Sequence, residues 1–464
     1  MKLLVKVAVS LIMGIAIALV LPPSFTMAQR IMAGIFVGAA CLWITEALPP
    51  FATAIGAIVA CVFGLGAPQG AMSGGGAKGY LVFLEPLVDP VIFLFLGGCI
   101  MALAVEKNGL DRWMARWFLL PFAKTERTFL LGVVLVTGLF SMFMSNTATT
   151  LMMLTLIKPM LEATKENRPL ASATVMAVAF AANIGGMGTI VGSPPNAIAV
   201  AMLERRSVQI SFAEWMSLGV PLSLILLLGL WFIVSRSVRG SADGARRQLT
   251  ALIQKAIAED AKEGALWSRM WVGAVFLATV ALWITESLHG WNSGMVALLP
   301  IGLFAVTRVL DPEDLRKIPW EVIVLIAGGL ILGRGLEKTG LAGRMLELLP
   351  EDIGSLKLVG ILLITTILLS NFMSNTSAAL MIMPLALMLV PDAPVRAALS
   401  VAWGASLAMS LPISTPPNAI AYGTGLFSTR EMGLVGTLCT CVGCLLLIFL
   451  LGIIGDWVEL KLAR

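Results

Sequence analysis

Two polar motifs that each occur twice inside apolar sequence constrain the fold of this chain more than any other feature. Met-Ser-Asn-Thr at residues 144–147 recurs at 373–376, 229 residues later. Pro-Pro-Asn at 194–196 recurs at 416–418, 222 residues later. With three further pairs of landmarks in the same order, they indicate an internal duplication. The further pairs are Leu42–Glu46 with Leu282–Glu286, Gly97–Gly98 with Gly328–Gly329, and Glu106–Leu110 with Glu337–Leu341.

The composition is typical of a membrane protein. Of 464 residues, 58% are hydrophobic and 13% are charged, whereas a soluble domain carries about 25% charged residues. The mean hydropathy is +0.93. A helix needs about 20 apolar residues to cross a bilayer core, and we expect eleven spans. They are 5–22, 31–48, 51–66, 89–105, 172–204, 214–235, 268–287, 293–308, 320–336, 396–426 and 431–455.

The first apolar stretch has two interpretations. Lys2 and Lys6 precede an apolar run that ends at Leu21, and a small-residue site lies near Ala28. This pattern also fits a cleaved secretory signal peptide. We favour a first helix that is retained.

Two further apolar stretches, 128–160 and 357–390, each carry a Ser-Asn-Thr triplet at the centre. Irregular backbone survives at bilayer depth only where protein or a water-filled cavity satisfies it. We therefore expect two re-entrant hairpins with the triplets at their tips. Each copy then has five spans, and an odd number inserts the second copy upside down, as in the inverted repeats of secondary transporters.

The positions of Lys and Arg fit this topology. With the N-terminus in the cytoplasm, 21 of the 32 Lys and Arg residues lie on the inner side and 11 on the outer side, as the positive-inside rule predicts. The predicted fold is an all-α polytopic membrane protein of about eleven transmembrane helices. Its parts are a leading helix (1–29), a first repeat (30–236), a cytoplasmic linker with an amphipathic helix (237–266), and a second repeat (267–464).

The long span that follows each hairpin is interrupted. Span 172–204 contains Gly185-Gly186, Gly188 and Gly192 and then Pro194-Pro195. Span 396–426 contains Pro412 and Pro416-Pro417. A Pro-Pro pair breaks a helix, frees carbonyl groups and exposes a helix N-terminus. Carbonyl, hydroxyl and amide oxygens suit Na⁺, and helix N-termini suit carboxylates. Two hairpin tips that face two broken helices predict a site for a small anion between two cations. No central span has an Arg or Lys at its core, so the cations and neutral donors would hold the anion.

Other chemistries have weaker support. With His289 as the only histidine, the chain cannot form a His-Glu-x-x-His zinc site, and its aspartates lie in loops or at span ends, so we expect no enzyme activity. No ring of filter carbonyls or charges indicates an ion channel. We interpret Glu46, Glu286 and His289 as interfacial residues and the six cysteines as inert thiols.

The paired Ser-Asn-Thr and Ser/Thr-Pro-Pro-Asn motifs closely resemble those of the divalent anion/sodium symporter family, also called INDY-type transporters. The likeness covers essentially the whole chain and is greatest to the bacterial sodium-coupled dicarboxylate members. It implies a homodimer in the bacterial inner (plasma) membrane, with a cytoplasmic N-terminus. Spans 2–4 and 7–9 would form a fixed scaffold, and the hairpins with spans 5 and 10 would move as an elevator.

The resemblance also implies the ligands of the site. The first sodium site would use Ser141, Ser145, Asn146 and the backbone of Gly192. The second would use Ser370, the backbone of Met373, Ser374, Asn375 and the backbone of Ser414. Asn146, Thr147, Asn375 and Thr376 would hold the substrate carboxylates, with Ser193 and Thr415 nearby. Family members carry threonine in place of Ser370 and alanine in place of Ser414, so we expect only the carbonyl of Ser414 to matter.

The implied function is Na⁺-coupled symport of C4-dicarboxylates such as succinate, fumarate or malate into the cell. Na⁺ and the dicarboxylate would bind in a coupled way, and the other partner would be membrane lipid. Neither an organic cofactor nor nucleic acid is expected. The alternatives are a Na⁺-independent dicarboxylate exchanger and a citrate or sulfate transporter of the same fold.

Overall fold

The computed structural model describes residues 2–72, 79–163, 168–236, 238, 251, 266–347 and 354–453. Across these residues every regular element is a helix and none is a strand, which confirms the all-α prediction. Most of the predicted linker 237–266 lies outside the described residues, so its amphipathic helix stays a prediction.

A leading helix, α1 (Lys2–Val20), precedes the first half of the duplicated sequence. That half ends with a helical hairpin, a broken helix and one long helix. Its helices are α2 (Met27–Thr45), α3 (Pro50–Cys61), α4 (Leu81–Leu84), α5 (Pro90–Lys107), α6 (Leu110–Leu119), α7 (Glu126–Ser141), α8 (Asn146–Ala163), α9 (Arg168–Gly185), α10 (Pro194–Glu204) and α11 (Phe212–Ser235). A π-helical turn (Val62–Gly66) extends α3, and three short 3-10 turns (Glu85–Val88, Leu120–Phe122 and Gly186–Gly188) extend α4, α6 and α9.

The second half contains helices in a similar order. Here too a hairpin is followed by a broken helix and one long helix. They are α13 (Leu266–Ile284), α14 (Glu286–His289), α15 (Ser293–Val306), α16 (Pro312–Leu315), α17 (Trp320–Lys338), α18 (Leu341–Leu346), α19 (Ser355–Ser370), α20 (Asn375–Leu389), α21 (Pro394–Ser406), α22 (Pro416–Tyr422) and α23 (Thr429–Ile453).

Each Ser-Asn-Thr triplet starts the second helix of a hairpin. The Ser145 hydroxyl accepts the N–H of Ala148, and the Ser374 hydroxyl accepts that of Ser377. A serine at this place satisfies an N–H group that the first turn of a helix leaves unpaired. The stretches 128–160 and 357–390 thus fold as two helices that contact each other, α7 with α8 and α19 with α20.

Helices of one half pack against helices of the other through glycines at equivalent positions. A Cβ on Gly97 of α5 would lie 2.7 Å from the Cβ of Ala297 in α15, and one on Gly328 of α17 would lie 2.6 Å from that of Ala54 in α3. Neither distance leaves room for a side chain, so glycine allows these backbones to approach closely. The duplicated landmark at Gly97 and Gly328 therefore makes a duplicated helix crossing.

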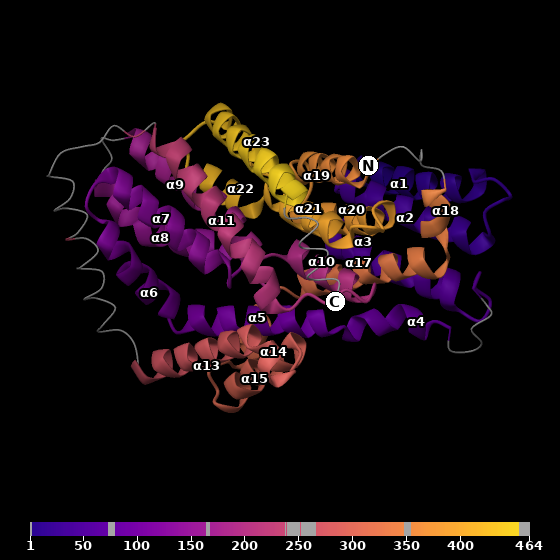
Figure 1. The fold of residues 1–464 in the computed structure, drawn as a ribbon, viewed down its shortest axis with the longest axis horizontal. Helices are drawn as coiled ribbons and strands as arrows, with labels where there is room; N and C mark the ends of the chain where they lie inside the picture. The colour runs from indigo at the N-terminus through magenta and orange to yellow at the C-terminus, as the bar shows by residue number, and fades with distance from the viewer. Residues whose placement is uncertain are drawn as a thin grey trace.

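The two broken helices also contact the opposite half. α10 packs against α21, and α22 packs against α9. Figure 1 shows α7, α8 and α9 together at one end of the molecule, α1 and α2 at the other end, and α10 and α21 between them. This arrangement brings each Pro-Pro-Asn segment to the other half of the chain.

The outer surface is that of a multi-pass membrane protein. Within the described residues, seven helices are long and apolar enough to span a bilayer, and four shorter apolar helices accompany them. Leu4 and Leu19 of α1 are 73% and 75% exposed, whereas α9 is buried from Leu170 to Gly185. So much exposed apolar surface is stable only against lipid or another chain. Eleven crossings remain a prediction.

Candidate functional site

The tip of the first hairpin carries a cluster of oxygens around a buried serine. The Ser141 Oγ lies 2.7 Å from Asn146 Oδ1 and 2.7 Å from the carbonyl oxygen of Ala182. A hydroxyl holds one hydrogen, so Ser141 can donate to only one of these two acceptors. The three oxygens therefore share one hydrogen, and their remaining lone pairs suit a hard cation.

The tip of the second hairpin carries an equivalent cluster. The Ser370 Oγ lies 2.8 Å from Asn375 Oδ1 and 2.8 Å from the carbonyl oxygen of Ala405. Ser370 is completely buried, as Ser141 is. The structure thus brings each predicted serine to its predicted asparagine.

Backbone of the first broken helix completes the surroundings of the first tip. A Cβ on Gly186 would lie 2.6 Å from Asn146 Oδ1 and 3.0 Å from the carbonyl oxygen of Gly192. A Cβ on Gly192 would lie 2.7 Å from the Gly186 oxygen and 2.9 Å from the Met142 oxygen. Glycine is needed at both positions because any side chain would displace these oxygens. Gly192 therefore lies beside Asn146, where the sequence analysis expected a sodium ligand.

The second broken helix reaches its tip through a side chain. The Ser414 hydroxyl lies 3.1 Å from both the carbonyl oxygen and Oδ1 of Asn371, and it accepts the N–H of Leu411. The sequence analysis expected only the Ser414 carbonyl to matter, but the hydroxyl also joins the broken helix to the hairpin. In the first half the Thr189 hydroxyl makes this connection by donating to the Met142 carbonyl.

The asparagine of each Pro-Pro-Asn segment closes the break in its helix. Asn196 and Asn418 each donate both amide hydrogens to carbonyl oxygens ten and seven residues earlier in the chain. Because the chain leaves helical geometry after Gly188 and after Ser406, these carbonyls would otherwise lack a partner in a buried region. The two asparagines therefore hold the irregular backbone in shape.

One amide connects the two halves of the site. The Asn183 Nδ2, on α9, lies 3.1 Å from Thr415 Oγ1 and 3.2 Å from Asn418 Oδ1, both at the start of α22. All three side chains are buried. The second Pro-Pro-Asn segment is thus bonded to the first half of the chain.

The remaining predicted residues lie at helix starts around the two tips. Thr147 and Thr376 are half-buried in the first turns of α8 and α20. Ser193 and Thr415 precede α10 and α22, and only Thr415 caps its helix, by accepting the Asn418 N–H at 3.2 Å. The other three predicted sodium ligands belong to the hairpin turns, where Ser145 and Ser374 cap helices and Met373 is buried.

The sequence analysis missed four asparagines, and a repeat signal existed for two of them. Asn196 and Asn418 lie in the duplicated motif, so their spacing could have identified them. Asn183 and Asn371 have no asparagine at the equivalent position of the other half. Ser406 and Met142 occupy those places, because Ala182 with Ala405 and Ser141 with Ser370 set the register.

Charged and metal-binding groups contribute little to the described site. Within the residues that the structure describes, no group of three or more His, Cys, Asp or Glu could hold a metal ion. The lone His289, at the end of α14, bonds to the Leu282 carbonyl of α13 and to the Trp291 N–H. Any cation at the hairpin tips would therefore be held by neutral oxygens.

Comparison with known proteins agrees with this architecture. The citrate transporter family model matches residues 40–408. The chain belongs to this family of transporters. Two staphylococcal proteins, each called sodium-dependent dicarboxylate transporter SdcS, are 31% identical to it. The Staphylococcus saprophyticus protein aligns over 87% of this chain and 82% of its own length, and that of Staphylococcus aureus strain USA300 over 88% and 82%.

Membership of this family settles two expectations. The likeness of the hairpin motifs to the divalent anion/sodium symporters is confirmed. The protein is a transporter and not an enzyme. The roles of individual site residues stay predictions.

Proposed function

We propose that this protein is a Na⁺-coupled symporter that carries C4-dicarboxylates such as succinate, fumarate or malate into the cell. The names of its relatives, which describe sodium-dependent dicarboxylate transport, support this proposal. The observation that carries it is the pair of equivalent serine-centred oxygen clusters at the hairpin tips.

Each cluster would hold one Na⁺. At the first site Ser141, Ser145, Asn146 and Gly192 would supply neutral oxygens, and at the second Ser370, Met373, Ser374, Asn375 and Ser414 would do so. Na⁺ is a hard cation that binds such oxygens without a full negative charge. Na⁺ is therefore cargo here, and no organic cofactor is required.

The dicarboxylate would bind between the two sodium ions. Asn146 with Thr147 and Asn375 with Thr376 would hold its carboxylates, with Ser193 and Thr415 nearby. The starts of α8, α10 and α20 add the partial positive charge of helix N-termini. Two sodium ions would supply the charge that a dianion requires, so each ligand would strengthen the binding of the other.

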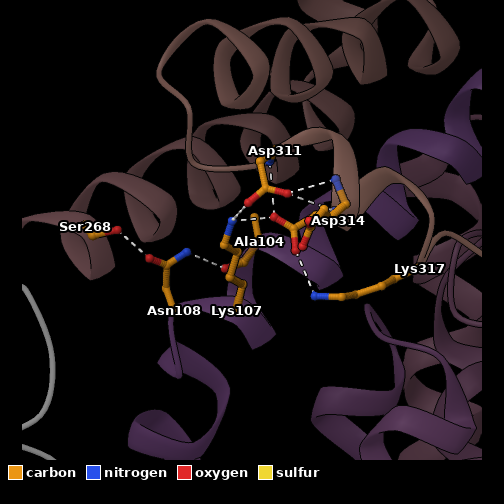
Figure 2. Close-up of polar contacts among 8 residues, drawn as sticks. Ala104, Lys107, Asn108, Ser268, Asp311, Asp314 and Lys317 are labelled. Atoms are coloured by element: carbon orange, nitrogen blue, oxygen red, sulfur yellow. Dashed lines mark hydrogen bonds and ion pairs between the residues drawn. The ribbon is translucent and has the colours of Figure 1, made fainter.

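The proposal includes an inverted-topology repeat with the N-terminus in the cytoplasm. Ion pairs between the halves support it, because each joins residues that this topology places on one side. Lys107 pairs with Asp311 at 3.0 Å on the predicted inner side, and Figure 2 shows that the same ammonium also pairs with Asp314. Arg334 pairs with Glu85 at 3.2 Å on the predicted outer side.

Transport would proceed by an elevator movement. The hairpins and broken helices would move together past a scaffold that contains α5 and α17. Hydrogen bonds within the moving part support this division, since Ser141 and Ser370 tie each hairpin to its broken helix and Asn183 ties the halves together. We place the protein in a bacterial plasma membrane as a homodimer, and its exposed apolar side chains are suited to lipid.

A second candidate is citrate transport, because the matching family is described as one of citrate transporters.

The test of the proposed symport is uptake of labelled succinate into proteoliposomes with an imposed Na⁺ gradient, with choline in place of Na⁺ as the control. Uptake that requires Na⁺ supports the symporter. Uptake that ignores Na⁺ but increases with internal succinate would indicate an exchanger. Absence of succinate uptake together with uptake of labelled citrate or sulfate would indicate the other substrates.

A further inference from the structure

We propose that Asn183 is a positioning residue, which holds the hydroxyl of Thr415 as a hydrogen-bond donor to one carboxylate of the substrate. This inference rests on the proposed function. Asn183 lies on α9, in the half of the chain opposite to Thr415, and is completely buried. It would act through Thr415 and need not touch the substrate itself.

The chemistry of Asn418 determines which atom of Asn183 faces it. Asn418 donates both of its amide hydrogens to carbonyl oxygens of the broken helix, so the atom that it turns toward Asn183 is Oδ1. An amide oxygen only accepts hydrogen bonds. Asn183 must therefore present its Nδ2, which lies 3.2 Å from Asn418 Oδ1.

The second hydrogen of Asn183 Nδ2 then determines the direction of the Thr415 hydroxyl. Thr415 Oγ1 accepts this hydrogen at 3.1 Å and the backbone N–H of Asn418 at 3.2 Å. A hydroxyl has two lone pairs and one hydrogen, so both lone pairs are occupied. The remaining O–H must point away from these donors, and among the described residues no acceptor receives it. A carboxylate offers only acceptors, and a hydrogen bond to it is strong.

In the first half of the chain, the residues equivalent to Thr415 and Asn183 do not fix the direction of a hydroxyl in this way. Ser193, at the position of Thr415, makes no capping bond to α10. Ser406, at the position of Asn183, is buried, and its hydroxyl has no hydrogen-bond partner among the described residues. The Ser193 hydroxyl can therefore rotate, whereas that of Thr415 cannot. The carboxylate near Thr415 would thus meet a hydroxyl whose direction is fixed. The carboxylate near Ser193 would meet a hydroxyl that can turn toward it.

Loss of Asn183 should weaken substrate binding without abolishing transport. In Asn183→Ala, the Thr415 hydroxyl regains a free lone pair and can rotate, so the KM for succinate at saturating Na⁺ should rise about tenfold, with a smaller change in kcat. Asn183→Ser should behave alike, and it copies the residue that the chain carries at Ser406.

The decisive test is a double-mutant cycle with Thr415→Val, measured as Na⁺-driven succinate uptake. If Asn183 acts through the Thr415 hydroxyl, adding Asn183→Ser to Thr415→Val should raise KM no further. Thr279→Val is a matched control, because this buried hydroxyl bonds only to its own helix, α13. Asn108→Ala is the matched control for the amide, because Asn108 bonds to Ala104 and Ser268 at the far end of α5.

Two results would overturn the inference while wild-type uptake leaves the proposed function intact. One is independent, multiplying effects of the two substitutions on KM, and the other is an Asn183→Ser variant with unchanged KM. Either would mean that Asn183 is only structural. If the wild type shows no Na⁺-driven succinate uptake, the proposed function fails and the inference fails with it. Melting temperatures of all variants identify any that are misfolded.

Discussion

Ser141 and Ser370 are the residues on which the proposed sodium sites depend most. Each hydroxyl lies within 2.8 Å of two acceptor oxygens and has one hydrogen to offer. In each cluster the single hydrogen leaves one of the two close oxygen pairs without a donor between them, and a cation would offset the repulsion of that pair. The symmetry of the two clusters predicts that the loss of either serine has a similar effect.

We expect Ser141→Ala and Ser370→Ala each to raise the Na⁺ concentration for half-maximal succinate uptake about tenfold, the effect of losing roughly 1.4 kcal/mol of binding. Thr137→Val and Thr366→Val are matched controls. These buried threonines lie one turn earlier on α7 and α19 and bond only to their own helices. Equal shifts in the serine variants and the controls would contradict the assignment.

The family resemblance led to Ser141 with Asn146 and to Ser370 with Asn375, and the structure brings each of these pairs together. The sequence analysis missed the duplicated Asn196 and Asn418 as well as Asn183 and Asn371, which are not duplicated. Asn183 could not be found in this way, because its contact with Thr415 joins positions 232 residues apart. A contact of that kind depends on how the two halves pack, which neither motif spacing nor hydropathy records.

At the scale of helices, glycine allows α7 of the first hairpin to pack closely against α9 of the broken helix. A Cβ on Gly185 of α9 would lie 2.3 Å from the carbonyl oxygen of Gly138 in α7. Backbone cannot move aside as a side chain can, so the two helices would have to separate.

We expect Gly185→Ala to destabilise the protein by about 1–3 kcal/mol, as overpacking of a core commonly does. The measurement is the melting temperature of the purified protein in detergent or nanodiscs. Gly229→Ala on α11 is the matched control. A Cβ there meets nothing within 4 Å, so alanine should be neutral or slightly stabilising. A Gly185→Ala variant as stable as Gly229→Ala would refute the close crossing.

The short helix α16 connects the two halves of the proposed scaffold through an ion-pair cluster of Lys107, Asp311, Asp314 and Lys317 (Figure 2). Burial raises the pKa of Asp314, but hydrogen bonds from Lys107 and Lys317 outweigh it and hold that pKa below its usual range. A carboxylate of this kind stabilises the fold above its unfolded pKa of about 3.9. That stabilisation is lost as the pH falls through the lower folded pKa.

Asp314→Asn should therefore lower the melting temperature at pH 7, through a loss of about 1–3 kcal/mol. The difference from the wild type should narrow as the pH falls below about 4, because the wild type then begins to lose the same contribution. Melting curves of both proteins between pH 7 and pH 3 provide the measurement. A difference that stays constant over this range would show that the charge of Asp314 is irrelevant.

At the scale of the whole molecule, Arg205 joins the part that we propose to move to the proposed scaffold. At the end of α10, Arg205 bonds to Asp89 before α5 at 3.2 Å and to the Leu330 carbonyl of α17 at 3.1 Å. Leu330 lies eight residues before Lys338, the last residue of α17, which is about 12 Å along a helix. In the proposed topology, Arg205 therefore joins the outer end of α10 to the outer end of α5 and to the interior of α17.

An elevator movement would have to break the contact between Arg205 and Asp89. We expect cysteines at these two positions, joined by a short thiol-reactive cross-linker in a variant without other cysteines, to abolish succinate uptake until the link is cleaved. Cysteines in place of Lys107 and Asp311 are the matched control, because that pair lies within the proposed scaffold. Full uptake by the cross-linked Arg205–Asp89 pair would exclude this movement.

The duplication and the apolar spans were predictable from the sequence because both are linear patterns. The exchange of partners between halves, α5 with α15 and α17 with α3, was not predictable. It depends on which glycine faces which alanine across two helices, as Gly97 and Ala297 show, and every apolar helix presents several candidate faces.

The central claim is that sodium at the hairpin tips creates the binding site for the dianion. The most direct test is the Kd of succinate for the purified protein, measured by calorimetry over a range of NaCl at ionic strength held constant with choline chloride. We predict that log Kd falls with log[Na⁺] with a slope approaching about two, one sodium ion per tip, and that succinate tightens Na⁺ binding reciprocally. A succinate Kd that is the same in NaCl and choline chloride would contradict the account.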